Sequence, residues 1–595
     1  MNDHSAITGD FIIASGPDAG DWLRGRQDFN VEVDVDGAGV ATRGDVLTGR
    51  DSGGRRWLAL ADLVEGRVED AFSGNDDKPQ VHWRGRFALA SWTTDGNGIV
   101  ACSDHFGSLP LYWCRHDDFV AVATDLRLLL DAPGVDREPD LTAVYHYLNF
   151  ACIPAPLTIC RDIHRIEPGT RLRLAGGHVH GERYYLPQYP VDLDGSDDTL
   201  AEALRQRIVA SVHAYRPPDS AAWGCFLSGG TDSSSIVSIL ARQQPEPRVQ
   251  TCSIGFEEAG YDELEFARIA GEACGAQPHL ERVDRTRSLA LLEEVLDAYD
   301  QPFGNASAIP TLACAELGRA QGFDTMLGGD GGDEIFGGNQ RYAKDKVMES
   351  FYRLPSPLKS AARGISRALG GNGNLTLNRI RNFTQRASLP NPDRFYTDDS
   401  FASDFHDDLL TEQFRGQVPR DASLQFMRGV YALGEPDESL HRIMRLDLLM
   451  AIAQNDLVKV HRACKHHGIA ARFPYLDPEL VAYCGRLPAR YKVRGVNKRY
   501  LFKQAMDGIL PQAILRKPKQ GFGLPIAVWM KDDPALKSLV CDTLLDGRAR
   551  SRGWINPDFV TRLLDLHMAG GWDHSAAIWQ LLVLELWLRR YMDAR

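Results

Sequence analysis

The sequence predicts a two-domain α/β protein, in which a β-rich first domain precedes a larger domain built on a parallel sheet. Short apolar runs separated by Gly- and Asp-rich turns fill the first 190 residues. From residue 199 strand-like and helical runs alternate, which is typical of a parallel sheet. From about residue 345 to residue 595 helical patterns dominate, so we expect a helical end to the second domain.

Length and composition restrict the class of protein. The chain has 595 residues, enough for two to four domains at roughly 150 residues each. Its net charge of −13 makes it a poor partner for nucleic acid or an anionic membrane, except through a local basic patch. Eleven scattered cysteines without a CxxC pair favour reduced thiols and a cytoplasmic location. We find no signal peptide, and the apolar run 578–588 is interrupted by Gln580 and Glu585, which predicts a buried helix.

The first domain is expected over residues 1–190. Its clearest strand candidates are RRWLALADLV at 55–64 and GRFALASW at 85–92. The segment 186–198 is rich in Pro, Asp and Gly and lacks helical periodicity, so we interpret it as a linker. The second domain then covers 199–595.

The second domain begins with a predicted helix at 199–215. Its apolar face is formed by Leu200, Leu204, Ile208 and Val212. Residues 221–243 read as a strand, a glycine turn and a helix. A strand at 250–256, a helix at 261–274 and a third strand with a Gly/Asp loop at 324–338 follow.

The glycine turn Ser228–Ser234 predicts an anion site. Glycines let the backbone approach a ligand, and free N–H groups at a helix start favour an anion such as pyrophosphate. Asp232 would repel a bare phosphate, but its presence is explained if Mg²⁺ bridges it to the phosphates. The turn is neither a GxxxxGKS loop nor a GxGxxG turn. The alternative is a Gly/Ser turn that only caps a helix.

This turn resembles the pyrophosphate loop of the N-type ATP pyrophosphatases. Further segments resemble class B asparagine synthetases, in family order: 104–113, 145–170, 327–342, 471–481, 495–511 and 516–525. The resemblance covers roughly residues 80–595. It implies an Ntn-hydrolase-like αββα sandwich, as in a degenerate class II glutamine amidotransferase. An adenine nucleotide α-hydrolase-like ATP pyrophosphatase domain would follow it.

The resemblance also implies a reaction: ATP adenylates a carboxylate, pyrophosphate leaves, and an amine attacks the acyl carbon. The implied ATP-binding residues are Leu227, Ser228, Gly229, Gly230, Asp232, Ser233, Ser234, Ser253, Ile254, Gly328 and Gly329. Asp232 and Asp333 would hold Mg²⁺. Lys498 and Lys519 would face the phosphates, and Asp330 would take a proton from the amine.

Two departures from the family narrow the function. Glutamine-dependent members begin Met-Cys-Gly, whereas this chain has Asn2 and its first cysteine is Cys102, so we expect a silent glutaminase domain. The family's glutamine-binding segments are also not recognisable in the first 80 residues. His461 and Ala470 stand where the family commonly has acids, which puts aspartate as substrate in doubt. We interpret His461 as either a substrate contact or a helix-surface histidine.

The family contains branches with an inactive first domain, namely β-lactam-forming synthetases and lasso-peptide macrolactam cyclases. The length favours the lasso cyclases, in which an amine of the same peptide attacks at high effective concentration. We therefore expect a precursor peptide as the carboxylate substrate and a processing protease as a partner. The alternatives are an asparagine synthetase, a β-lactam-type synthetase and a non-catalytic scaffold.

Overall fold

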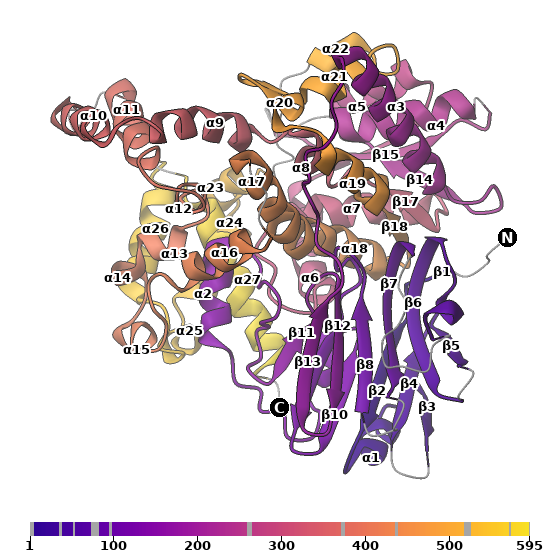
Figure 1. The fold of residues 1–595 in the computed structure, drawn as a ribbon. Helices are drawn as coiled ribbons and strands as arrows, with labels where there is room; N and C mark the ends of the chain where they lie inside the picture. The colour runs from indigo at the N-terminus through magenta and orange to yellow at the C-terminus, as the bar shows by residue number, and fades with distance from the viewer. Residues whose placement is uncertain are drawn as a thin grey trace.

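The computed structural model of the chain describes residues 5–34, 38–51, 54–72, 83–93, 98–244, 246–258, 264–369, 375–434, 438–516, 525–570 and 573–593. Two antiparallel sheets form the lower part of the molecule in Figure 1, and the parallel sheet lies above them. Helices from the last third of the chain cover the left side. The predicted succession of a β-rich part, a parallel sheet and a helical end is confirmed.

The first domain is a sandwich of two antiparallel sheets. One sheet has the order β1 (Ser5–Ala6), β6 (Arg56–Glu65), β7 (Arg84–Trp92), β8 (Gly98–Ser103), β12 (Thr170–Ala175), β13 (His178–Arg183), with β5 (Leu47–Arg50) beside β6. The other has the order β11 (Ile163–Arg165), β9 (Tyr112–His116), β10 (Phe119–Ala123), β2 (Asp10–Ser15), β4 (Gly39–Arg43), β3 (Asn30–Val33). The predicted strands at 55–64 and 85–92 are β6 and β7.

Alternation along the strands builds the core of this sandwich. On β2, Phe11 and Ile13 point into the space between the sheets, whereas Ile12 and Ala14 face the opposite side. On that opposite side α1 (Ala19–Arg24) packs against β2 and β4, and the 3₁₀ helix η2 (Leu126–Leu129) packs against β9 and β10. The central strands β2 and β10 are therefore buried on both faces. Helix α2 (Leu141–Phe150) packs against helices of the helical end.

The second domain contains a five-stranded parallel sheet. Its order is β16 (Gln277–Val283), β15 (Gln250–Phe256), β14 (Trp223–Phe226), β17 (Thr325–Leu327), β18 (Ala470–Arg472). Helix α3 (Asp197–Ala214) precedes β14, and the helices between β14 and β17 are α4 (Thr231–Gln243), α5 (Leu264–Cys274), α6 (Arg285–Ala298) and α7 (Ala308–Ala320). Because the chain runs outward from β14 on one side and from β17 on the other, the strand order reverses between these two strands.

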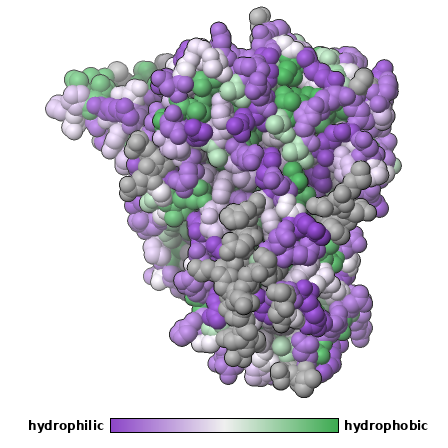
Figure 2. Space-filling model, turned by 45° about the vertical axis from the view of Figure 1, so that its right-hand side comes forward, coloured by the Kyte–Doolittle hydropathy of each residue, from purple (hydrophilic) through white to green (hydrophobic). Residues whose placement is uncertain are grey.

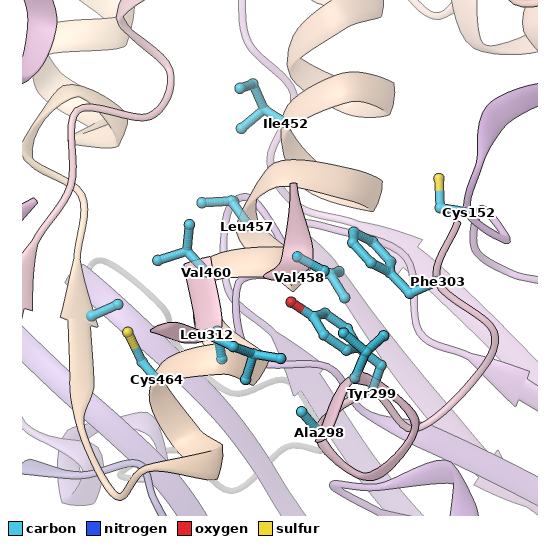
Figure 3. Close-up of a cluster of buried hydrophobic side chains, with 14 of the residues drawn as sticks. Cys152, Ala298, Tyr299, Phe303, Leu312, Ile452, Leu457, Val458, Val460 and Cys464 are labelled. Atoms are coloured by element: carbon cyan, nitrogen blue, oxygen red, sulfur yellow. The ribbon is translucent and has the colours of Figure 1, made fainter. Parts of the chain in front are cut away.

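The longest element of the helical end is one continuous helix beside the parallel sheet. It runs through α17 (Ser439–Asp447), a π-helical segment Leu448–Asp456 and α18 (Leu457–His466). Figure 3 shows the buried cluster beneath it, where Tyr299 and Phe303 stack with ring centroids 4.5 Å apart near Val458. The predicted buried helix at 578–588 lies within α27 (Ser575–Tyr591).

An arm of three helices projects from the body at the upper left of Figure 1. It consists of α9 (Gln340–Tyr352), α10 (Ser356–Leu369) and α11 (Leu375–Arg386). Residues 350–392 contain seven basic and no acidic residues, so this is the local basic patch that an acidic chain can still carry. Figure 2 shows hydrophobic and hydrophilic side chains mixed on the arm, and Leu358 and Ile365 are 56% and 61% exposed.

The remaining helices are short and complete the helical end. They are α8 (Gly332–Phe336), α12 (Asp393–Tyr396), α13 (Phe401–Asp404), α14 (His406–Leu409), α15 (Glu412–Arg415), α16 (Ala422–Ala432), α19 (Pro478–Arg486), α20 (Ala489–Lys492), α21 (Tyr500–Ala505), α22 (Gln512–Arg516), α23 (Ile526–Asp532), α24 (Pro534–Leu544), α25 (Gly547–Ser551) and α26 (Pro557–Met568). A hairpin of β19 (Val493–Arg494) and β20 (Asn497–Lys498) precedes α21. No helix among the described residues is both long enough and apolar enough to cross a membrane.

His461 lies between the two domains, so its interpretation as a helix-surface histidine is wrong. It is only 3% exposed, and its Nδ1 lies 3.0 Å from a guanidinium nitrogen of Arg86 on β7. Burial and the charge of Arg86 hold its pKa well below the usual value for histidine. His461 is therefore a neutral partner for a buried arginine at the domain interface. The sequence alone did not indicate that the first domain covers this face of α18.

Candidate functional site

The site lies where the order of the parallel strands reverses. Ligands of open α/β sheets bind outside the carboxyl ends of the strands at such a reversal. The loop after β14 carries Ser228–Ser233, and the loop after β17 carries Gly328–Asp333. A cavity of about 1530 Å³ opens between these two loops.

Most of the residues predicted from the sequence meet at this cavity. Those that line it are Leu227, Ser228, Gly230, Asp232, Ser233, Ser253, Ile254, Gly329, Asp330, Asp333 and Lys498. Gly229 and Gly328 contribute to the loops without lining the cavity. Ser234 is fully buried within α4 and does not line it either. Lys519 falls outside the described residues.

The first loop is shaped to present backbone N–H groups. Gly229 has φ +69°, and a Cβ there would lie 2.7 Å from the backbone of Phe266, so only glycine fits. The Oγ atoms of Ser228 and Ser233 lie 3.2 Å apart and close the turn. Helix α4 starts at Thr231 directly after it, so the positive end of the helix dipole faces the cavity.

The second loop packs directly on the first. A Cβ on Gly329 would lie 2.9 Å from the backbone nitrogen of Ser233 and 3.0 Å from the Cβ of Asp232. The two loops therefore approach as closely as backbone allows. This contact brings the carboxylates of Asp232 and Asp333 to the same side of the cavity.

The strand ends beside the loops carry three more of the residues that the sequence predicts to bind ATP. Ser253 donates a hydrogen bond of 2.6 Å from its Oγ to the carbonyl oxygen of Leu227, which ties β15 to the end of β14. Leu227 and Ile254 are 2% and 4% exposed and supply apolar contact surface at the cavity wall. Such a wall suits a flat aromatic ligand with polar edges.

Arg499 is the most important residue that the sequence reading missed. Its guanidinium binds both oxygens of the Asp232 carboxylate and also the Asp333 carboxylate. Arg499 has φ +55° at the start of α21, and this backbone turn directs its side chain into the cavity. Neighbouring Lys498 instead donates a hydrogen bond of 3.0 Å to the carbonyl oxygen of Gly338.

The donor set at Asp232 and Asp333 fits a divalent cation. Carboxylate oxygens are the ligands that Mg²⁺ prefers, and both carboxylates already pair with the guanidinium of Arg499. A Cβ on Gly332 would lie 2.5 Å from an oxygen of Asp232, so glycine leaves these oxygens room. Arg499 supplies a positive charge beside both carboxylates.

A second charged group lies across the cavity at the end of the π-helical segment. Lys459 donates a hydrogen bond of 2.6 Å to Asp456, and both line the cavity with Asp330. Removal from water raises the pKa of Asp330 to about 6, and the positive charge of Lys459 opposes that rise. Asp330 is thus poised to exchange a proton near neutral pH. π-helical segments are rare and frequently lie at functional sites.

Comparison with known proteins identifies the family. The model described as "Asparagine synthase" matches residues 197–589, roughly two thirds of the chain. The chain belongs to the asparagine synthase family. A "Glutamine amidotransferase domain" model matches residues 73–185, which confirms the class II amidotransferase-like fold of the first domain.

Proteins from bacteria and from a fungus align with most of the chain. A protein of Mycobacterium tuberculosis, provisionally named a glutamine-hydrolysing asparagine synthetase, is 29% identical over 89% of this chain and 82% of its own. Glutamine-hydrolysing asparagine synthetase 1 of Bacillus subtilis is 26% identical over 85% of this chain and 77% of its own. Amidase chry2 of Gibberella zeae is 24% identical over 75% of this chain and 70% of its own. The chain is accordingly a carbon–nitrogen ligase of the asparagine synthetase type, as the sequence predicted.

Proposed function

We propose that the chain activates a carboxylate of a peptide with ATP and joins it to an amine of the same peptide, which closes a macrolactam. The observation that carries this proposal is the cavity between the two glycine loops. Its volume of about 1530 Å³ exceeds the roughly 300–1,000 Å³ typical of small-molecule sites. Space therefore remains for an acyl substrate larger than an amino acid once ATP is bound.

In the first step a carboxylate oxygen attacks the α-phosphorus of ATP, and the bond to the bridging oxygen of pyrophosphate breaks. The N–H groups at the start of α4, with Ser228 and Ser233, would receive the pyrophosphate. Arg499 lies beside this loop and would pair with the charge released on the leaving group. Mg²⁺ held by Asp232 and Asp333 would supply further positive charge to the phosphates.

In the second step the amine nitrogen attacks the acyl carbon, and AMP leaves with the bonding electrons. The amine must lose a proton as the C–N bond forms. Asp330 lines the cavity, and with a pKa of about 6 it is deprotonated at neutral pH yet basic enough to accept this proton. Lys459 would keep the Asp330 carboxylate in position and limit the rise in its pKa.

The chemistry of the first domain supports an amine that does not come from glutamine. Its cysteines Cys102, Cys114, Cys152 and Cys160 are all buried. Burial raises the thiol pKa of each, and a protonated thiol is a poor nucleophile. An amine on the acyl substrate itself needs no glutaminase and reacts at a high effective concentration. The partners would then be a precursor peptide and the protease that processes it.

Asparagine synthesis is the second candidate function. The names of the aligned M. tuberculosis and B. subtilis relatives favour it. Both candidates use the same adenylation site and differ in the acyl substrate and the amine. In asparagine synthesis, aspartate would supply the carboxylate in place of the peptide, and ammonia would replace the amine of the peptide.

The test compares substrates under identical conditions. The purified chain is incubated with ATP and MgCl₂, with either aspartate plus ammonia or linear peptides that carry an Asp or Glu side chain and a free N-terminus. We expect pyrophosphate, AMP and a cyclic peptide 18 Da lighter than the linear peptide, the mass of one water in any amide condensation. Efficient asparagine formation would favour the second candidate. Equal pyrophosphate release by wild type and Asp232→Ala would contradict both.

A further inference from the structure

A second cluster of ligating side chains lies outside the cavity, on the surface where α6 meets the end of α18. It consists of Glu294 on α6, His466 at the last position of α18, and His467 directly after it. Their side chains are 27%, 29% and 14% exposed, so the group is partly buried and still open to solvent. The adenylation reaction uses none of these residues.

The three side chains converge on one point. Nε2 of His466 lies 3.9 Å from Oε2 of Glu294, and Nε2 of His467 lies 4.0 Å from the same oxygen. These separations are too long for hydrogen bonds. The Nε2 atom of His467 is buried and has no hydrogen-bond partner. A buried ring nitrogen aimed at a carboxylate it does not reach indicates a ligand between them.

The spacing fits a transition-metal ion. All three ligand atoms lie within 4.8 Å of one another. An ion equidistant from three such atoms would lie roughly 2.3–2.5 Å from each, against about 2.0–2.2 Å for zinc bonds to His nitrogen and carboxylate oxygen. Tetrahedral bonds of this length place ligand atoms roughly 3.4 Å apart, so side-chain shifts of about half an ångström to one ångström complete the geometry. Two imidazoles with one carboxylate favour Zn²⁺ over Mg²⁺ or Ca²⁺, which prefer oxygen ligands alone.

The surroundings orient the carboxylate. Arg287 donates a hydrogen bond of 3.0 Å to Oε1 of Glu294, which leaves Oε2 facing the two histidines. The charge of Arg287 is matched by its ion pair with Glu316. The negative end of the α18 dipole also lies at His466 and favours a cation there.

We propose that Glu294, His466 and His467 form a zinc site, with water as the fourth ligand, that fastens the end of α18 to α6. These helices already meet through the buried cluster of Figure 3, and the Tyr299 hydroxyl after α6 donates a hydrogen bond of 3.0 Å to the carbonyl oxygen of Lys459. A bound ion would extend this contact to the surface. Because the other end of α18 carries Lys459, the ion would stiffen a helix that reaches the cavity.

The test measures zinc binding without ATP or peptide, so its outcome is independent of the proposed synthetase activity. The full-length chain is treated with EDTA, dialysed, and titrated with ZnSO₄ by calorimetry. We expect one equivalent bound with a Kd in the micromolar range or below. Free zinc at 100 times Kd would stabilise the fold by about 2.7 kcal/mol and raise Tm.

Matched variants locate the ion. His467→Gln and the double variant His466→Gln/His467→Gln should bind zinc at least about 10-fold more weakly, as expected for loss of metal ligands. His178→Gln, an exposed histidine on β13, should bind as wild type does. Cobalt(II) bound at the site should lack a thiolate charge-transfer band, which separates it from binding at cysteines. No zinc binding by wild type, or unchanged binding by the double variant with unchanged Tm in EDTA, would overturn the proposal.

Discussion

Arg499 and Asp232 form a bidentate ion pair in the cavity between the two glycine loops, and the same guanidinium also holds Asp333. The arginine is 7% exposed, so the group is largely withdrawn from water. The two carboxylates that would bind Mg²⁺ are therefore kept together by a protein cation. This arrangement leads to the first prediction.

Arg499→Met is expected to destabilise the protein, because it removes the buried cation that binds both of these carboxylates. Breaking a buried pair in this way costs about 3–5 kcal/mol. Millimolar MgCl₂ should restore part of the lost Tm in the variant and change wild type little. Thermal unfolding with and without MgCl₂ measures both effects.

Arg494→Met is the matched control, since Arg494 lies in the hairpin just before Arg499 and pairs with Asp197 while its side chain is 43% exposed. Its loss should cost no more than about 1 kcal/mol. Equal Tm values for the two variants, or no effect of MgCl₂ on Arg499→Met, would show that the two carboxylates do not form a cation site.

Asp330 is expected to determine how the rate of amide formation falls at acidic pH, which is the acidic limb of the pH profile. Because burial raises its pKa to about 6, the carboxyl is protonated below that pH and cannot accept a proton from the amine. The rate of amide formation should fall about tenfold per pH unit below pH 6. Asp330→Asn should lose about 10²–10⁴-fold in rate and lose this limb. A wild-type rate that is flat down to pH 5 would argue against Asp330 as the base.

Lys459 is a positioning residue, and its effect should appear in the same profile. Its positive charge lowers the pKa of Asp330, so Lys459→Met should move the acidic limb to higher pH. Lys459→Arg keeps the charge and should leave the limb close to its wild-type position. If both variants lose activity without a shift of the limb, Lys459 acts on folding or binding and not through Asp330.

Gly329→Ala is expected to separate the two glycine loops. The new Cβ would lie 2.9 Å from the backbone nitrogen of Ser233, and backbone on both sides leaves little room to adjust. We expect about tenfold weaker binding of α,β-methylene-ATP, since displaced N–H donors each contribute about 1–1.5 kcal/mol. Gly429→Ala in α16, where a Cβ meets no atom within 4 Å, is the control and should bind normally.

The loops were predictable from sequence because their chemistry is local. A glycine turn between an apolar strand and a helix presents N–H groups wherever it occurs, so Ser228–Ser233 could be recognised without a fold. Arg499 could not be distinguished from Lys498, because the positive φ that directs it inward is a tertiary feature. Asp456 and Lys459 were missed because one ends a π-helical segment and the other follows it, and a 3.6-residue period does not describe such a segment.

The limits of the fold prediction have similar causes. Strand β16 carries Pro278 and several polar residues, and β18 has only three residues, so neither stands out as an apolar run. Each becomes a strand because a neighbouring strand pairs with it. His461 reads as a helix-surface residue until the first domain packs Arg86 against it.

Binding of α,β-methylene-ATP with MgCl₂ tests the central claim most directly, because it needs no acyl substrate or amine. Calorimetry on the full-length chain should show one site for wild type, and Asp232→Ala should bind at least about tenfold more weakly, a loss of about 1.4 kcal/mol. No binding by wild type at millimolar analogue, or equal affinity in Asp232→Ala, would contradict the assignment of the cavity as an ATP site.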